Sequence, residues 1–335
     1  MPALLVVAVL LATGCGREDE SAGPTSAAAG FESRPVITLV VNDWTASALD
    51  VAIAEQLIER HLGYPVVGAR IDDSAEIYDG LADGSLDGLL EIWPSAMTDR
   101  DRQYFDSGRV HDIGTLGPVG QVGWWVPRYL VDENPALATW EGYLDPAVAE
   151  QFATPATAPK GTFLGTAAGY EQYDEQIIDN LGLPFTVMFT GSEQATTEVL
   201  DQRVGLAEPV LTYWWTPTAA IKQFDLTQVE LPPSTDECEA SRATGDGGVD
   251  CAYPADALFK AMSPQLPTKA PAVAEFLTRF ELTTADQIEL LYRVEVEQRS
   301  VEAAAGEWIA ANRDRWQPWV DAAVTAGGDD PPGSD

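Results

Sequence analysis

Two short runs, VITLVVNDW at residues 36–44 and LDGLLEIWP at residues 86–94, decide the fold class. Each contains a stretch of mainly apolar residues, which is typical of a strand buried on both faces of a sheet. Between them the sequence predicts, in order, a helix at residues 47–60, a short strand at 65–67 and a second helix at 74–83. Ser47 with Asp50 is the expected N-terminal cap of the first helix. This βαβαβ order predicts parallel strands joined by helices, and therefore an α/β fold.

The rest of the chain continues the alternation less regularly, and a second unit is expected to begin near Gly117. The expected elements are, in order, a strand at 122–126, a broken helical stretch at 140–152, a turn region of small residues at 161–169, helices at 171–181 and 193–202, a strand at 210–215, and helices at 272–280, 284–297 and 301–324. A length of 335 residues is sufficient for two domains or one large one. A hydrophobic content of 45% excludes a disordered chain.

The N-terminal residues are expected to lie outside the fold. The apolar run at residues 4–11 is too short to span a bilayer as a helix. It leads into LATGC, which resembles the cleavage site of bacterial lipoproteins, where the cysteine, here Cys15, becomes the lipidated first residue. We expect residues 1–15 to be the signal segment and residues 16–34 to be a flexible tether. An ordinary cleaved signal peptide with an incidental cysteine is the alternative.

The other two cysteines agree with a location outside the cytoplasm. Once Cys15 is assigned to the lipid, Cys238 and Cys251 remain as an even pair on either side of a polar, glycine-rich stretch. A disulfide between them would stabilise the fold by about 2–4 kcal/mol by restricting the unfolded chain. Two buried free thiols are the alternative.

The chain is strongly acidic, with 53 Asp and Glu against 19 Lys and Arg and a formal net charge of −34. This balance excludes a nucleic-acid-binding surface, which needs clustered basic residues. It also disfavours docking on anionic lipids by charge alone. The charge indicates solubility first, and it also favours cationic ligands.

Tryptophans follow three of the expected strands. Trp44 follows the first strand, Trp93 follows the strand that ends at residue 92, and Trp214 and Trp215 close the strand at 210–215. In open α/β sheets, ligands bind beyond the carboxyl ends of the strands. An isolated tryptophan is more often core filler, but three strand ends of this kind favour a pocket with aromatic walls.

Such a pocket suits a quaternary ammonium ion, which has no N–H group to donate. Its charge is stabilised by the electron-rich faces of aromatic rings, at roughly 0.5–2 kcal/mol per ring. Asp43 would add a negative charge facing the cation, or else it caps the turn. A carboxylate on the ligand would need backbone N–H donors, which the turn region at 161–169 could supply.

Several short motifs follow one another along the chain: Val41-Asn42-Asp43-Trp44, Leu62-Gly63-Tyr64, Glu91-Ile92-Trp93-Pro94, Gly123-Trp124, Pro127-Arg128-Tyr129, Trp215-Thr216-Pro217, Trp308-Ile309 and Trp316-Gln317-Pro318-Trp319. In order and spacing they resemble the glycine betaine/choline-binding proteins of ABC importers, over about residues 36–322. The resemblance implies a two-lobe periplasmic-binding-protein fold of type II, with a sheet flanked by helices in each lobe and the ligand in the cleft between them. The expected division is residues 35–118 plus 240–322 for lobe I, 119–239 for lobe II, and 323–335 for a disordered tail.

The resemblance also implies which residues form the aromatic box. Trp93 would come from lobe I and Trp215 from lobe II, while Trp124 lies on a crossover strand at a position that forms a wall in some members. Trp44 with Asp43 is similar to the choline-type arrangement. Because Trp93 and Trp215 would lie on opposite lobes, we expect the lobes to close about a hinge in the crossover near residues 117–123.

This sequence departs from the family at one place, because the family's middle tryptophan, in the glycine-rich turn of lobe II, has no equivalent here. Tyr170 is the nearest aromatic residue and the expected substitute. Betaine, proline betaine, carnitine and choline therefore all remain candidate ligands.

The sequence thus predicts an extracytoplasmic, lipid-anchored binding protein that delivers quaternary ammonium compounds to the permease of an ABC importer, without a cofactor or metal. A binding protein for a sugar or amino acid on the same fold is the first alternative, and it would need several polar side chains around the tryptophans. A secreted hydrolase is the second. The chain has no Gly-x-Ser-x-Gly motif, no phosphate-binding loop and only two histidines, which disfavours it.

Overall fold

The computed structural model describes residues 34–71, 74–167 and 172–328. From Pro35 onward, the described residues form one compact unit. The expected signal segment, Cys15 and Tyr170 lie outside the described residues, as does most of the expected tether and of the C-terminal tail. In the part of the chain that is described, no helix combines the length and apolar character needed to cross a membrane.

The N-terminal part has the predicted βαβαβ arrangement. Strand β1 (Ile37–Val41) pairs in parallel with both β2 (Val66–Arg70) and β3 (Gly88–Ile92). The connecting helices are α1 (Thr45–Leu57), which continues into a π-helical turn at Ile58–Leu62, and α2 (Ser74–Asp83). The alternating βα pattern read from the sequence is confirmed here.

The predicted cap of α1 is wrong. The helix begins two residues before Ser47, with Trp44 as its N-cap residue and no side-chain cap. The Ser47 hydroxyl instead accepts a hydrogen bond from the backbone N–H of Asn42 at 3.0 Å. Asp50 is fully buried, 0% exposed, because it lies on the face of α1 that packs into the core.

The remaining elements follow in chain order: helix α3 (Asp99–Asp106), strand β4 (His111–Pro127), helices α4 (Arg128–Glu133) and α5 (Pro146–Ala149), strand β5 (Gly161–Gly165), helix α6 (Asp174–Asn180), strand β6 (Phe185–Phe189), helix α7 (Glu193–Gly205), strand β7 (Leu211–Thr216), helix α8 (Ala219–Gln223), strand β8 (Leu226–Val229), helix α9 (Asp236–Thr244), strand β9 (Ala255–Met262), and helices α10 (Leu266–Lys269), α11 (Pro271–Arg279), α12 (Thr284–Glu295), α13 (Val301–Ala311) and α14 (Arg313–Gly327). Short 3-10 turns lie at Pro94–Ala96, Pro135–Ala138, Trp140–Tyr143 and Glu150–Phe152.

The region 161–169, expected to be a turn, begins with a strand, because Gly161–Gly165 pairs with both β6 and β7. The single helix expected at 301–324 is two helices that meet at Asn312.

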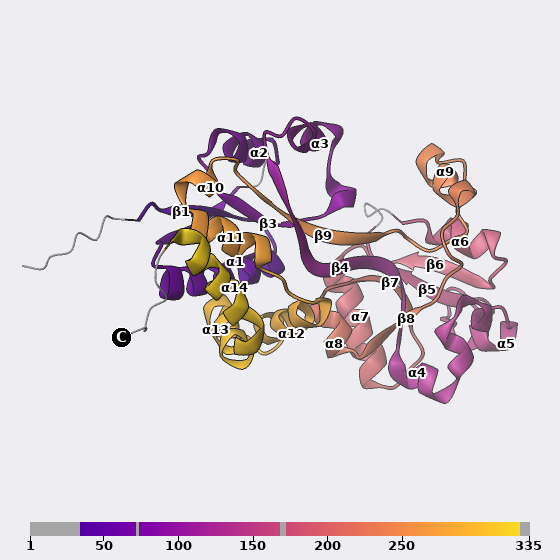
Figure 1. The fold of residues 1–335 in the computed structure, drawn as a ribbon. Helices are drawn as coiled ribbons and strands as arrows, with labels where there is room; N and C mark the ends of the chain where they lie inside the picture. Colours follow the sequence, from indigo (N-terminus) through magenta and orange to yellow (C-terminus); the bar gives the residue numbers. More distant parts are fainter. Residues whose placement is uncertain (1–33, 72–73, 168–171, 329–335) are drawn as a thin grey trace, which may run out of the picture. The chain divides into compact units, whose positions relative to one another are not determined.

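One sheet runs through both halves of the described chain, in the order β2-β1-β3-β9-β4-β7-β5-β6, with β8 also paired to β4. The long strand β4 joins the two halves: its first part pairs with β9, and its last part pairs with β7 and β8. Figure 1 shows β4 and β9 running side by side between the two groups of elements. The β4–β9 register shifts twice, and Gly117 adopts φ +107° where a side chain would meet the Leu282 carbonyl oxygen at 1.9 Å. Only glycine fits this bend.

Among the described residues, four groups of buried side chains flank the sheet, and the largest group of each half of the chain forms its main core. The first core is built on β1, α1, β3 and the C-terminal helices, and includes Leu39, Ile53 and Phe276. The second core is built on the end of β4 with β5 and β7, and includes Phe163 and Leu211. Each group encloses its own apolar interior, as expected for a two-lobe α/β arrangement.

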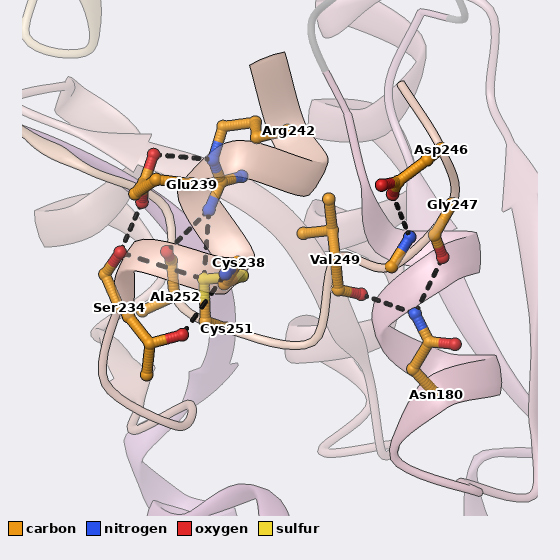
Figure 2. Close-up of a disulfide and its surroundings, with 12 residues drawn as sticks. Asn180, Ser234, Cys238, Glu239, Arg242, Asp246, Gly247, Val249, Cys251 and Ala252 are labelled. Atoms are coloured by element: carbon orange, nitrogen blue, oxygen red, sulfur yellow. Dashed lines mark hydrogen bonds and ion pairs between the residues drawn. A yellow bond between two sulfur atoms is a disulfide. The ribbon is translucent and has the colours of Figure 1, made fainter. Parts of the chain in front are cut away.

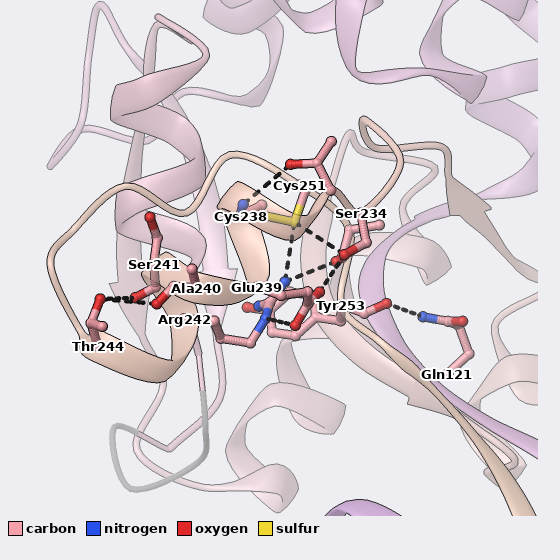
Figure 3. Close-up of polar contacts among 12 residues, drawn as sticks. Gln121, Ser234, Cys238, Glu239, Ala240, Ser241, Arg242, Thr244, Cys251 and Tyr253 are labelled. Atoms are coloured by element: carbon pink, nitrogen blue, oxygen red, sulfur yellow. Dashed lines mark hydrogen bonds and ion pairs between the residues drawn. A yellow bond between two sulfur atoms is a disulfide. The ribbon is translucent and has the colours of Figure 1, made fainter.

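Part of the segment expected in lobe I packs with the second core. Val249, Cys251 and Tyr253 are buried there, and the Gln121 side chain on β4 donates a hydrogen bond to the Tyr253 carbonyl oxygen at 3.2 Å (Figure 3). This packing favours a return to the first lobe at β9 rather than at residue 240. The division of the chain into lobes remains a prediction in its other details.

The predicted disulfide is present, and it closes a small arm of the second core. Cys238, on α9, is bonded to Cys251, with their Cα atoms 6.3 Å apart (Figure 2). The Asn180 amide of α6 donates to the carbonyl oxygens of Gly247 and Val249, both at 2.9 Å. Arg242 donates to the Ala252 carbonyl oxygen at 3.0 Å. The arm is thus held by a covalent bond and by hydrogen bonds that side chains donate to its backbone carbonyl oxygens.

Replacing both cysteines by alanine is expected to lower the free energy of unfolding by about 3 kcal/mol, which is the value expected for a disulfide that closes a short loop of the unfolded chain. The two residues are separated by 13 positions in sequence. Chemical denaturation followed by circular dichroism measures the effect. Reductant added during denaturation should bring the wild-type transition to that of the variant and leave the variant unchanged. A variant as stable as the wild type would contradict this prediction.

Candidate binding site

A cavity of about 410 Å³ lies where residues from both cores meet, and its walls carry two kinds of chemistry. Large aromatic side chains form one part and carboxyl groups another. The residues that define it are Trp44, Trp93, Trp215, Glu91, Glu193 and Glu295. The volume suits a small solute.

Trp93 is the most firmly held of the three tryptophan side chains that line the cavity. Its indole N–H donates to the Glu91 carboxylate at 2.8 Å. The ring lies against Gly120 of β4, where a Cβ atom would come within 2.1 Å of it. The turn that follows is tied to β9, since Ser95 donates its N–H and its hydroxyl to Asp256 at 3.0 and 2.5 Å. Strand β3 thus supplies the ring, and the shared strands β4 and β9 support it from behind.

Trp215 forms the wall contributed by the second half of the chain. It stacks on Trp214 with ring centroids 4.8 Å apart and planes at 20°. Trp214 is buried, and its indole N–H donates to the Thr218 hydroxyl at 2.8 Å. Of this adjacent pair, Trp215 lines the cavity together with Pro217 and Thr218.

Trp44 completes the aromatic walls. It is the residue that precedes α1, and 44% of it is exposed although it is a large apolar side chain. Thr45 and Ala46, in the first turn of α1, also line the cavity. The structure therefore brings together the three tryptophans that follow β1, follow β3 and end β7.

Other predicted box residues lie elsewhere. Trp124 is 1% exposed and does not line this cavity. Its ring packs 4.9 Å from that of Phe163, and its indole N–H donates to Asp174 at 2.7 Å inside the second core. Asp43 is exposed and is not among the residues that line the cavity. Tyr170 lies outside the described residues.

Three glutamates of the cavity were not predicted as site residues. Burial raises the pKa of Glu91, although hydrogen bonds from Trp93 and Trp44 partly oppose this. Burial and, to a lesser extent, the charge of Glu295 raise the pKa of Glu193 on α7. Burial also raises the pKa of Glu295 on α12, against a hydrogen bond with Thr45.

Only one of these three glutamates could have been recognised as a site residue from the sequence. Glu91 interrupts an apolar strand two residues before a tryptophan, and a buried carboxyl group at such a place needs a partner. Glu193 and Glu295 begin and end surface helices and are indistinguishable in sequence from the other acidic residues, of which there are 53 in total.

The chemistry of the cavity favours a positive, methylated group. Indole faces attract cations, and carboxylates near the walls add negative charge. Among the described residues, no lysine or arginine lines the cavity. The arrangement suits a small positively charged solute, and together with the two-lobe α/β fold it is typical of a solute-binding protein.

Comparison with known families identifies the class more closely. The chain belongs to the family of substrate-binding domains of ABC-type glycine betaine transport systems, whose model matches residues 35–311. The family consists of substrate-binding proteins of ABC transporters rather than enzymes, and these work outside the cytoplasm. A trimethylamine N-oxide-binding protein of Pelagibacter ubique (strain HTCC1062) is 27% identical over 297 residues, covering 86% of this chain and 92% of that protein.

Solved structures show the same fold. Lactococcal OpuAC, in a closed form with glycine betaine, matches 85% of this chain and 99% of its own with a TM-score of 0.54 and 16% identity. A choline-binding protein of an ABC transporter, in complex with choline, matches 88% of this chain and 96% of its own with a TM-score of 0.54 and 15% identity. The predicted type II periplasmic-binding-protein fold is confirmed, with the difference that its sheets are joined through β4 and β9.

Proposed function

We propose that this protein captures a small methylated ammonium solute without a carboxylate, such as choline or trimethylamine N-oxide, for import by an ABC transporter. The observation that carries the proposal is the composition of the cavity: three tryptophans and three glutamates, with no basic side chain among the described residues that line it. A trimethylammonium group gains from the indole faces and from the carboxylates at once.

A ligand carboxylate would fit this cavity less well. It would enter a space with three acidic side chains and would find no lysine or arginine there among the described residues. One observation favours glycine betaine as a second candidate. The first turn of α1 has no side-chain cap and reaches the cavity at Thr45 and Ala46, so its N–H groups could bind a carboxylate.

Capture is expected to involve closure of the two lobes. Trp93 belongs to the half built on β3 and Trp215 to the half built on β7, and a ligand favours the closed state only if it contacts both better when they close. The bend of β4 around residues 117–123 is the proposed hinge. Anchoring through a lipid on Cys15 and delivery to a permease belong to the same proposal.

Calorimetric titration of the purified protein tests the ligand class. We expect heat from choline or trimethylamine N-oxide, at least about tenfold weaker binding of glycine betaine and carnitine, which is ~1.4 kcal/mol, and no heat from maltose. Tighter binding of glycine betaine than of both carboxylate-free solutes would overturn the proposal in favour of the second candidate.

Trp215→Ala is expected to weaken choline binding by about 5- to 30-fold, because loss of one cation–π face removes ~1–2 kcal/mol. Trp319→Phe is the matched control: Trp319 packs against the first core and does not line the cavity. Titration calorimetry of both variants measures the difference. Equal affinities of Trp215→Ala and the wild type would remove this ring from the proposed site.

A further inference from the structure

Two buried carboxyl groups from different elements lie next to the aromatic walls, and one of them, Glu91, also lines the cavity. Asp50 of α1 is 0% exposed, and Glu91 of β3 is 2% exposed. Both oxygens of Asp50 accept hydrogen bonds from the Gln287 amide of α12, at 3.1 and 2.9 Å. One oxygen of Glu91 accepts from Trp93, and its other oxygen has no hydrogen-bond partner among the described residues.

The two carboxyl groups act on each other. The pKa of Asp50 is raised well above its usual value, chiefly by burial and next by the charge of Glu91, against the hydrogen bond from Gln287. A side-chain hydrogen bond between the two groups raises the pKa of Asp50 further and lowers that of Glu91. Two adjacent buried carboxyl groups do not both ionise readily, because burial disfavours each charged form and the two like charges repel each other.

Other polar and charged side chains near Asp50 and Glu91 come from the elements that pack around them. Asn42, the residue after strand β1, contributes a neutral amide that donates to the Glu91 carbonyl oxygen at 3.1 Å. Helix α12 contributes Gln287 and, at the cavity, Glu295, while α7 contributes Glu193. The charges of Glu193 and Glu295 are negative when ionised, so they too disfavour a second charge on the pair.

We propose that Asp50 is a positioning residue that shares one proton with Glu91. With this arrangement Glu91 fixes the Trp93 indole through its hydrogen bond. The pair responds to a cation bound in the cavity by releasing protons. The inference rests on the proposed function, because it needs a ligand with a permanent positive charge in the cavity. A cation against the tryptophans stabilises the more ionised form of the pair next to them. Its binding therefore releases protons, and its affinity rises with pH by at most about tenfold per pH unit for each proton released.

The test uses choline, whose own charge is constant near neutral pH. Titration calorimetry at one pH in two buffers of different ionisation enthalpy gives the number of protons released on binding. The wild type is expected to release a measurable fraction of a proton. Asp50→Asn keeps the shape of the side chain and the hydrogen bond with Gln287 but removes the shared proton, so it is expected to lose this release.

Asp179→Asn serves as the matched control. It removes a carboxyl group at an exposed position that does not line the cavity, and it is expected to keep the release that comes from the pair. No release by the wild type while choline binds, or equal release by Asp50→Asn, would overturn the inference. Failure of choline to bind at all would instead reject the proposed function.

A second measurement needs no ligand. The tryptophan emission of the free protein is expected to change with pH as Glu91 takes up its proton beside Trp93, and the difference between wild type and Asp50→Asn isolates this step. Glu91→Gln, whose amide oxygen can still accept from Trp93, should abolish the same step. Identical pH profiles for the wild type and both variants would overturn the inference even if choline does not bind.

Discussion

Gly120→Ala is expected to weaken choline binding by about 10- to 100-fold, which is ~1.4–2.7 kcal/mol, the range found when atoms are forced into a well-packed place. A Cβ atom at this position would come within 2.1 Å of the Trp93 ring. The indole N–H is held by Glu91, so the far edge of the ring must turn into the cavity that it lines. The wall would then occupy the space of the ligand.

Titration calorimetry with choline measures this loss, and the thermal midpoint shows whether the fold is kept. Gly205→Ala is the matched control, because no atom lies within 4 Å of the Cβ that it would add. It should bind like the wild type. If Gly120→Ala also bound choline with unchanged affinity, Trp93 would not be a wall of the binding site.

The second large effect is on stability and arises from Asp174, the first residue of α6. Its carboxyl group is fully buried, with a pKa raised to about 7, chiefly because burial disfavours its charged form. Hydrogen bonds from Trp124 and Tyr253, at 2.7 and 3.0 Å, only partly oppose this. In the unfolded chain the same group ionises near its usual value of 3.8.

The sign follows from the two values. Between about pH 4 and pH 7 the folded state keeps the proton and the unfolded state has lost it, so stability falls as the pH rises. At 1.36 kcal/mol per unit, the full contribution is about 4 kcal/mol, present below pH 4 and lost by pH 7. Asp174→Asn keeps an oxygen for Trp124 and Tyr253 but does not ionise, so it is expected to lack this part of the slope.

Urea denaturation at pH 5, 6 and 7 measures the difference. Asp179→Asn, at an exposed position of the same helix, is expected to keep the slope of the wild type. Equal slopes for Asp174→Asn and the wild type would show that Asp174 is already ionised in the folded protein.

Much of the N-terminal fold and part of the site could be predicted from the sequence, because local patterns determine them. The apolar runs of β1 and β3 define strands whose ends must meet at one edge of a parallel sheet. Trp93 directly follows β3, Trp44 lies in the turn after β1, and Trp215 lies at the end of β7, so their convergence follows from their place in the elements. The Cys238–Cys251 disulfide was predictable because only two cysteines remain after Cys15 is set aside.

Tertiary structure alone decided the rest, because these features depend on which faces meet across the sheet. Trp124 lies on a strand that has β7 on one side and β8 on the other, and its ring is covered by the second core rather than open to the cavity. Asp50 reads in sequence as a helix cap, yet packing of α1 against β3 and α12 buries it beside Glu91 and Gln287. Helical spacing and strand alternation describe neighbours along one element, whereas a carboxyl pair or a cavity wall is formed by residues that are far apart in the chain.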